Sequence, residues 1–259
     1  MNPAQFLEYF DRISDAPDAI PRLRRFILDL AVRGKLVEQD PNDEPASRLL
    51  KRIQTRRARV TNDAGKKERE LLLKIGRERL PFELPNGWAW VHLGDVYSFE
   101  YGDNLPAERR TNTGEYPVYG SNGIVGTHSD RLVREPCIVV GRKGSAGALN
   151  LSLTDGCYVT DVAFYCVPPR EVDLEFTFKL FHTLGFKSLG KGIKPGLNRN
   201  EAYDLIFALP PVAEQRHIVA KVDELMALCD QLERQLTARQ SISRALLEAV
   251  LQWALSGSP

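Results

Sequence analysis

The sequence predicts an α+β protein with three parts: N-terminal helices and a basic linker over residues 1–80, a mixed α/β domain over 81–210, and a long helix over 211–259. Three observations lead to this prediction. Apolar residues recur at helical spacing before residue 60, and prolines, glycines and aromatics break the chain into short segments after Pro81. From Ile218 onward, apolar residues follow a heptad pattern. At 259 residues the chain is long enough to bury an ample core.

Residues 4–60 are expected to be helical: Phe6, Phe10 and Ile13 form a short apolar stripe, and two clearer helices follow it. The first opens at Pro21 and ends at Gly34, and its apolar face carries Leu23, Phe26, Ile27, Leu30 and Ala31. The second follows Pro45, with an outward face rich in Lys and Arg and an inward face of Leu49, Leu50, Ile53 and Val60. Residues 61–65 resemble a turn, and 66–80 fit either a further charged helix or a linker.

The middle of the chain contains apolar runs of strand length. Residues 88–93, 137–141, 158–167 and 203–209 each predict a strand, and Asp173 is placed to cap a short helix. Long glycine-rich loops, 101–127 and 141–156, separate these runs. Loops of this length in a compact domain are more often functional than structural.

The last segment predicts one continuous helix. Pro211 suits its first turn, and Glu214 favours the positive end of the helix dipole. The heptad seam stutters at Arg239 and Ser243 and then resumes. Its apolar positions are Ile218, Val222, Leu225, Cys229, Leu232, Leu236, Leu246 and Val250. A seam of this kind is buried against another helix, so the sequence predicts a helical partner.

The net charge of +1 conceals two basic stretches. Residues 48–79 contain twelve Lys or Arg and four acids, and residues 176–200 contain five Lys or Arg and no acid. Such patches can attract a polyanion even when the overall charge is small. For the first stretch, a solvated helix face is the favoured interpretation. For the second, the absence of any acid makes a polyanion site and a solvated face equally good interpretations.

Catalytic signatures are missing from the sequence. The segment 185–192 approaches a phosphate-binding loop, but Gly192 stands where the magnesium-binding Ser or Thr is required. The four cysteines and four histidines lack metal-ligand spacing, and no run is long enough to cross a membrane. The N-terminus does not resemble a signal peptide. We therefore expect a protein of the reducing cytoplasm with no catalytic residues, no metal and no cofactor.

Three loops carry residue types suited to nucleic acid. Arginine can donate two hydrogen bonds to guanine, and asparagine can form two with adenine, while lysine mainly contacts phosphate. The loops are 116–130, 140–150 and 191–201. Each alone is consistent with an ordinary polar turn, but three in one small domain favour DNA binding. Their candidate residues are Ser121, Asn122, Arg142, Lys143, Lys191, Lys194, Asn198 and Arg199.

At these residues the chain resembles the specificity (S) subunit of type I restriction-modification systems. The similar segments are AVRGKLVEQDPNDEPASRLL (31–50), LPNGWAWVHLGDV (84–96), YPVYGSNGIVG (116–126), IVVGRKGSAG (138–147), KPGLNRNE (194–201) and LPPVAEQRHIVAKVDEL (209–225). The resemblance implies a target-recognition domain that reads one half of a split DNA site. It also implies conserved helices that dock the methyltransferase subunit, and a non-catalytic role beside the modification and restriction subunits.

The chain departs from the family pattern in having one recognition domain and one long C-terminal helix, where a full subunit has two of each. We therefore expect a half-length form. Two copies would pair their C-terminal helices antiparallel and read a palindromic split site. The helix pair would act as the spacer between half-sites.

Among the loop residues, Arg142, Lys143, Lys194 and Asn198 are the first candidates for DNA contact. Arg109 and Arg110 lie in a loop that matches the family less well, so they are candidates for sequence-specific contact.

Other interpretations remain open. The chain could be a protein–protein adaptor without DNA binding, or an inactive remnant of a longer S subunit. Against the remnant, the final residues 254–259 follow a complete predicted helix, which favours a natural end. A stand-alone enzyme is the least supported interpretation, because no catalytic constellation is present.

Overall fold

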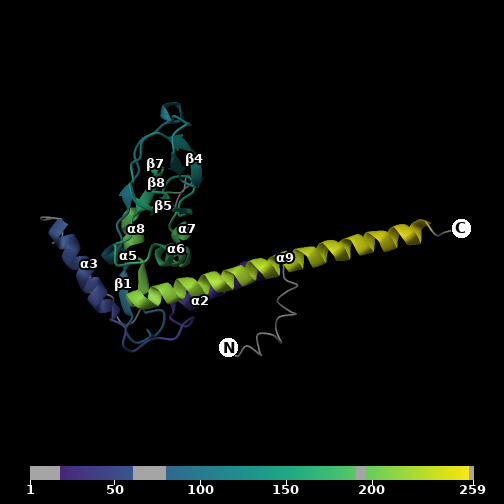
Figure 1. Cartoon of the computed structure of the whole chain (residues 1–259), viewed down its shortest axis with the longest axis horizontal. Helices are drawn as coiled ribbons and strands as arrows, with labels where there is room; N and C mark the ends of the chain where they lie inside the picture. Colours follow the sequence, from purple (N-terminus) through teal and green to yellow (C-terminus); the bar gives the residue numbers. More distant parts are fainter. Residues whose placement is uncertain (1–17, 61–79, 191–195, 257–259) are drawn as a thin grey trace. The chain divides into compact units, whose positions relative to one another are not determined.

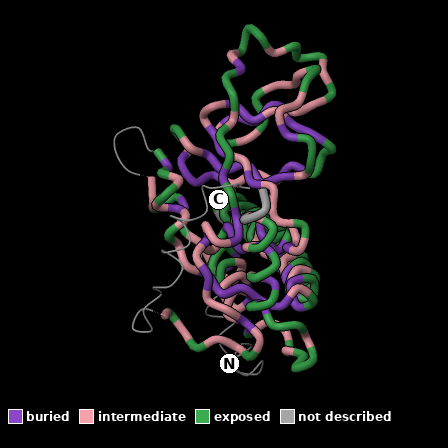
Figure 2. Tube along the Cα trace, turned by 90° about the vertical axis from the view of Figure 1, so that its left-hand side faces the viewer, coloured by how far each residue is buried: buried purple, intermediate pink, exposed green. Residues whose placement is uncertain are grey.

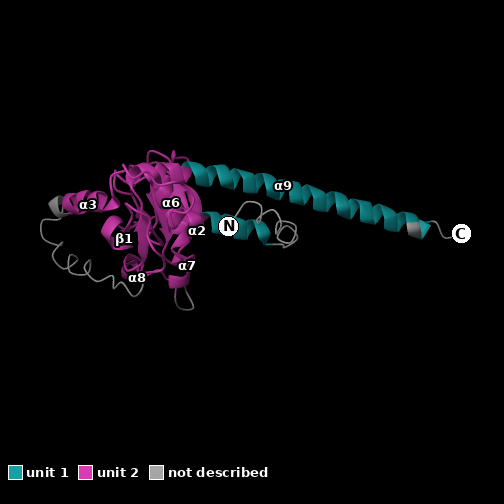
Figure 3. Cartoon of the chain, turned by 90° about the horizontal axis from the view of Figure 1, so that it is seen from below, with its two compact units in different colours: residues 1–27, 220–259 teal, residues 28–219 magenta. Residues whose placement is uncertain are grey.

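The structure is a computed structural model that describes residues 18–60, 80–190 and 196–256. These residues fall into two compact units (Figures 1 and 3). Unit 1 comprises residues 1–27 and 220–259, and unit 2 comprises residues 28–219. Three expected features lie outside the described residues: the helical stripe at 6–13, the turn at 61–65 and most of the segment 66–80.

The two N-terminal helices form as predicted. Helix α2 spans Ala19–Val32 and α3 spans Ala46–Val60. Gly34 ends the first helix with a left-handed φ of 64°, and the N–H of Lys35 donates to the carbonyl of Leu30 at 2.9 Å. A side chain at position 34 would collide with Pro85. In α3, Leu49 and Ile53 are buried.

Unit 2 contains three small sheets. In the first, β1 (Ala89–His92) pairs antiparallel with β9 (Ile206–Leu209). The second is antiparallel with the order β2-β8-β5-β6, and the third has the order β4-β3-β7 with β3 and β7 parallel. Their strands are β2 (Glu100–Tyr101), β3 (Tyr116–Gly120), β4 (Gly123–His128), β5 (Cys137–Gly141), β6 (Leu149–Ser152), β7 (Tyr158–Val159) and β8 (Ala163–Cys166).

The prediction of a single strand over 158–167 is wrong. The chain forms β7, turns at residues 160–162 and then forms β8 in a different sheet. The N–H of Thr160 donates to the carbonyl of Tyr119 at 2.9 Å, and its hydroxyl donates to the same carbonyl at 3.0 Å. This long-range contact continues the pairing of β7 with β3 up to the turn, and an apolar run by itself does not reveal that the chain then enters another sheet.

Short helices connect and cover the sheets. They are α5 (Leu93–Val96), the 3₁₀ helix η3 (Ala107–Arg109), α6 (Leu174–Thr183), α7 (Phe186–Leu189) and α8 (Arg199–Tyr203). As predicted, Asp173 caps α6, and its carboxylate accepts from the N–H of Phe176 at 2.9 Å. The predicted strand 203–209 is shorter than expected, because residues 199–203 form α8.

Figure 2 marks the buried residues along the Cα trace. Many of the fully buried side chains of unit 2 are aromatic. Phe99 and Phe164 stack with ring centroids 6.0 Å apart, and Phe181 meets Phe99 edge to face at 5.8 Å. The buried hydroxyl of Tyr97 lies 3.2 Å from Thr177 Oγ1, so this polar group is paired. Burial raises the pKa of Tyr97 far above its ordinary value, so the phenol stays neutral.

Helix α9 is one continuous helix of 45 residues, Val212–Ser256, roughly 68 Å long at 1.5 Å per residue. Residues from Ala220 onward belong to unit 1, together with the first part of α2. Arg24 of α2 joins these two segments, because it contacts Asp230 at 2.6 Å and Glu233 at 2.7 Å. Within the described ranges, no helix is long and apolar enough to cross a membrane.

Candidate nucleic-acid interface

Two of the glycine-rich loops meet in unit 2, although about fifty residues separate them in the sequence. The carbonyl of Arg142 accepts from the N–H of Leu197 at 2.8 Å, and Lys143 forms an isolated bridge with Gly196. The turn that follows β5 therefore lies against the segment that leads into α8. This contact brings Arg142, Lys143, Asn198 and Arg199 into one neighbourhood.

Tyr101 lies at the centre of this group. The guanidinium carbon of Arg142 is 4.8 Å from the Tyr101 ring centroid, and that of Arg199 is 5.0 Å from it. Such cation–π contacts stabilise an arginine beside an aromatic face. Tyr101 is 48% exposed on the edge strand β2. We call Tyr101, Arg142, Lys143 and Arg199 the Tyr101 cluster.

Backbone carbonyls fix both guanidinium groups of the Tyr101 cluster. Arg142 Nη1 donates to the carbonyl of Asp161 at 3.0 Å, and Arg199 Nη1 donates to the carbonyl of Phe99 at 3.2 Å. An arginine has five N–H donors, so each group retains donors for a ligand. A guanidinium held in place loses less entropy when it binds a phosphate or a base edge.

Lys143 forms an ion pair that a ligand can replace. Its Nζ lies 3.2 Å from the Asp161 carboxylate, and both side chains are about half exposed. Exposed pairs of this kind contribute little stability. A phosphate oxygen could therefore take the place of Asp161 at small cost.

The turn between β3 and β4 borders the same neighbourhood. Any side chain at Gly141 would collide with the backbone oxygens of Ser121 and Ser145, so glycine permits this close approach. Asn122 is exposed in the turn and Ser121 is half-buried. The candidate residues of loops 116–130 and 140–150 therefore lie near each other.

Asn198 has a local structural role. Its side-chain oxygen accepts from the N–H of Asn200 at 2.9 Å and caps the N-terminus of α8. The amide nitrogen remains available on an exposed side chain. Lys191 and Lys194 lie outside the described residues.

Arg109 ends η3, and the next residue, Arg110, contacts β4. Arg110 Nη1 donates to the carbonyl of Val125 at 3.1 Å, and its Nε donates to that of Leu105 at 3.3 Å. It thus ties its loop to β4. Arg109 is exposed at the end of η3 and makes no side-chain hydrogen bond or ion pair with the described residues. Ile124 and Val125 are exposed on the same strand.

The seam residues of the long helix divide into two groups. Ile218, Val222 and Cys229 are buried within the single chain, and Leu225, Leu232 and Leu236 are half-buried. In contrast, Leu246 is 65% exposed and Val250 is 51% exposed.

The sequence did not identify the buried polar anchors at the start of α9. Trp88 Nε1 donates to the Glu214 carboxylate at 2.8 Å, and Gln39 Nε2 donates to it at 3.1 Å. Gln215 accepts from the N–H of Asp173 at 3.0 Å. Burial raises the pKa of Glu214, which the two donors oppose only in part. The segment around 209–215 therefore connects β9 to α9 through buried hydrogen bonds and is not one of the candidate DNA-binding loops.

The described residues contain no group of three potential metal ligands, and all four cysteines are free and buried. The features of unit 2 are a small mixed-sheet domain, clustered cations on close-packed turns and a long helix that begins at its last strand. Clustered cations on a small domain are typical of a nucleic-acid-binding module.

Comparisons with known proteins show which family the chain belongs to. The family model for the type I restriction modification DNA specificity domain matches residues 85–239, and the chain belongs to this family. It is 31% identical to the type I restriction enzyme EcoAI specificity subunit of Escherichia coli, over 96% of this chain and 48% of that protein. With the EcoEI specificity subunit of the same organism it is 29% identical, over 90% of this chain and 43% of the relative.

The fold also matches a solved structure, that of the HsdS subunit from Thermoanaerobacter tengcongensis. The TM-score is 0.52 at 21% sequence identity, over 82% of this chain and 56% of the other. The prediction of a mixed α/β domain with N-terminal helices and a long C-terminal helix is confirmed. The chain spans about half the length of the curated relatives it matches.

Proposed function

We propose that this chain is a sequence-specific DNA-recognition subunit of a type I restriction-modification complex, and that it reads one half of a split site. The observation that carries the proposal is the Tyr101 cluster, where segments distant in sequence bring Arg142 and Arg199 onto one half-exposed tyrosine, with Lys143 next to Arg142 in the chain. Membership of the specificity-domain family supports it.

Within this proposal, some residues contact the DNA backbone and others contact the bases. Lys143 and Arg199 would meet phosphate oxygens and set the register of unit 2 on DNA. Arg109 would read a base edge, because it is exposed and has no hydrogen bond or ion pair to another described side chain. Arginine is suited to this work, since its planar fork matches guanine.

The far end of α9 is the proposed docking surface for other chains. Its apolar residues Ile242, Leu246, Leu247, Val250, Leu251 and Trp253 are all more than half exposed. At 100° per residue these positions cover an arc of roughly 160° to 200°. A two-helix coiled coil buries a narrower stripe. We therefore propose two neighbours, namely α9 of a second copy and helices of the modification subunit.

Two copies joined in this way would read a palindromic split site, because a two-fold protein axis imposes two-fold symmetry on its DNA target. The chain would itself be non-catalytic. Methyl transfer would belong to the modification subunit and cleavage to the restriction subunit, on DNA in the cytoplasm. The exposed distal face of α9 also fits a protein–protein adaptor without DNA binding.

Methylome sequencing tests the reading function. The chain is expressed with its modification subunit in a host that lacks type I methylation, and methylated sites are mapped. We expect a palindromic split motif that disappears without this chain. Arg109→Gln should relax one base position about 5- to 150-fold, whereas Lys143→Gln should weaken all sites alike.

A motif that persists without the chain would overturn the DNA-reading function and favour the adaptor. Light scattering after size exclusion tests the assembly separately. A chain that stays monomeric at micromolar concentration, both alone and with the modification subunit, would contradict self-association.

A further inference from the structure

The exposed face of α3 carries a second cluster of cations that the proposed reading loops do not include. Arg48, Lys51, Arg52 and Arg56 are exposed at successive turns, and Thr55 lies among them. The opposite face is fixed, because Leu49 is 1% exposed and Ile53 is 2% exposed. The cations therefore stand on a rigid helix rather than on a mobile arm. We call these five residues the α3 basic face.

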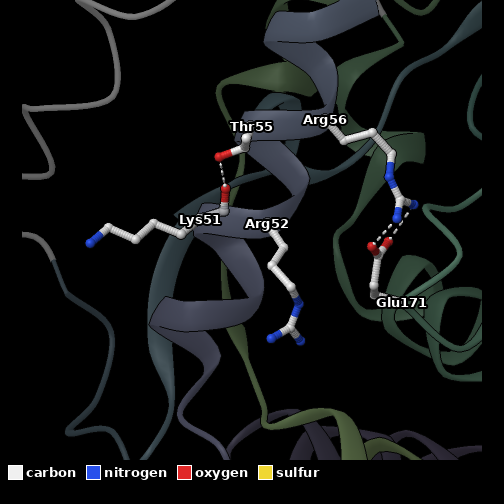
Figure 4. Close-up of a pocket in the computed structure, with 5 residues that line it drawn as sticks. All are labelled: Lys51, Arg52, Thr55, Arg56 and Glu171. Carbon is white, nitrogen blue, oxygen red and sulfur yellow. Dashed lines mark hydrogen bonds and ion pairs between the residues drawn. The ribbon is translucent and has the colours of Figure 1, made fainter.

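Arginine side chains of this face are held in place. Arg56 forms a two-pronged ion pair with Glu171 at 2.6 and 2.9 Å, and Arg52 contacts Glu44 at 2.6 Å. Figure 4 shows Arg56 turned toward Glu171, while Lys51 extends away from the other side chains. Neither Arg48 nor Lys51 forms an ion pair with the described residues. Four cations against two carboxylates leave an excess of two positive charges.

The charges of α3 are more one-sided than solubility alone would require. Helix α3 contains six Lys or Arg and no acid over Ala46–Val60. Arg48, Arg52 and Arg56 stand four residues apart, and like charges at that spacing destabilise a helix. A helix selected for solubility alone would mix both signs. The repulsion between these cations destabilises the helix. Binding of a ligand therefore explains the charge pattern better than solubility does.

The position of α3 within unit 2 favours DNA as the partner. Helix α3 packs against α5, α5 also packs against α8, and α8 begins at Arg199 of the Tyr101 cluster (Figure 1). Arg57 fastens α3 to α5, because its Nη1 donates to the carbonyl of Gly94 at 2.6 Å. Only α5 and α8 therefore separate the Tyr101 cluster from α3. A DNA duplex bound at the cluster would extend beyond it, toward α3.

We propose that the α3 basic face is a second, sequence-independent DNA contact, which grips the phosphate backbone outside the reading loops. The inference rests on the proposed function. From Arg48 to Arg56 the helix rises roughly 12 Å at 1.5 Å per residue. One strand of duplex DNA carries a phosphate every 3.4 Å or so along the axis, so the face spans about three or four phosphates.

The test compares the full chain with Arg48→Gln/Lys51→Gln. A matched control, Lys35→Gln/Arg216→Gln, removes two exposed cations of unit 2 that are not on α3. Fluorescence anisotropy measures binding to two 30-base-pair duplexes over a range of NaCl concentrations. One duplex carries the methylated motif and the other a mixed sequence. Circular dichroism checks that both variants are folded.

We expect the α3 variant to bind both duplexes roughly 10- to 50-fold more weakly at 0.1 M salt, and its salt slope to fall by about 2. The ratio between the two duplexes should not change, because phosphate contacts carry no sequence information. The control should match the unmodified chain.

Unchanged affinity and slope in the α3 variant, with normal binding by the unmodified chain, would overturn this inference and leave the proposed function standing. The inference would also be overturned if the variant kept its DNA affinity but no longer co-eluted with the modification subunit. The face would then serve an acidic protein surface. Failure of the unmodified chain to bind either duplex would instead overturn the proposed function and this contact with it.

Discussion

The two ends of α9 invert the usual rule for which residues are buried. At the start, Glu214 and Gln215 are polar and buried, with exposures of 1% and 0%. At the far end, Trp253 and Leu255 are apolar and exposed, at 77% and 81%. Both ends belong to one unbroken helix.

The difference lies in whether each end has its partners within the chain. The polar groups of Glu214 and Gln215 are satisfied by Trp88, Gln39 and Asp173, and buried polar groups are stable when they are hydrogen-bonded. The apolar side chains at the far end remain largely exposed to solvent, because nothing else in the described chain covers them. Exposed apolar patches of this kind mark sites of association. The comparison teaches that one end completes the fold of this chain, whereas the other presents an apolar surface that we propose binds another chain.

The largest expected effect is on the far end. We expect Leu246→Asp to weaken self-association at least about 1000-fold, because each copy loses a buried leucine and places a carboxylate in its site. Gln252→Asp is the matched control, since it adds the same charge on the polar stripe of Arg244 and Glu248. Light scattering after size exclusion measures the change. Equal loss in both variants would show that charge alone, and not the apolar face, controls assembly.

The next effect concerns the start of the helix. We expect Glu214→Ala to lower the free energy of unfolding by about 2–4 kcal/mol, because Trp88 Nε1 loses its acceptor in a buried site. Urea denaturation followed by fluorescence measures this. Glu224→Ala removes an exposed carboxylate further along the same helix, and its effect should stay within about 0.5 kcal/mol. A change no larger than that of the control would remove the contrast between the two ends.

Part of this contrast could be predicted from the sequence. The heptad seam indicated a long helix with a partner, and β5 was predicted with its observed bounds because all five of its residues are buried. Glu214 was misjudged, since its position suggested only a favourable charge at a helix end. Its burial depends on Trp88 and Gln39, which lie far away in the sequence and follow no periodic pattern.

The candidate interface was predictable in its residue types but not in its grouping. Glycine-rich loops with Arg, Lys and Asn indicated DNA binding. The contact between Arg142 and Leu197 places two of these loops together, whereas Arg109 makes no side-chain hydrogen bond or ion pair with the described residues. Tyr101 was missed entirely. No local pattern reveals that two arginines stack on its ring, because the three residues come from separate loops and strands.

The pH dependence of stability sharpens the comparison at Glu214. Its pKa is raised in the folded state, because burial penalises the carboxylate. The folded chain therefore holds this proton more tightly than the unfolded chain. The contribution to stability is complete below the ordinary pKa of 4.5 and is lost as the pH rises through the higher folded pKa.

The test is a series of urea denaturations across this interval of pH. In the unmodified chain, the contribution of Glu214 to the free energy of unfolding should fall as the pH rises, and Glu214→Gln should abolish that fall. The glutamine variant keeps the shape but cannot ionise. An identical pH profile in the two proteins would mean that Glu214 does not titrate differently on folding.

The smallest expected effect lies between the two ends, where Arg24 of α2 contacts Asp230 and Glu233. The carboxylates are about half exposed, so the network is screened by water and salt. We expect Arg24→Ala to cost about 0.5–1 kcal/mol at low salt and almost nothing in 1 M NaCl. Arg22→Ala is the control, because the Arg22 side chain, which pairs with Asp18, is 72% exposed, against 31% for Arg24. A loss that persists in high salt would mean that Arg24 stabilises α9 by packing rather than by charge.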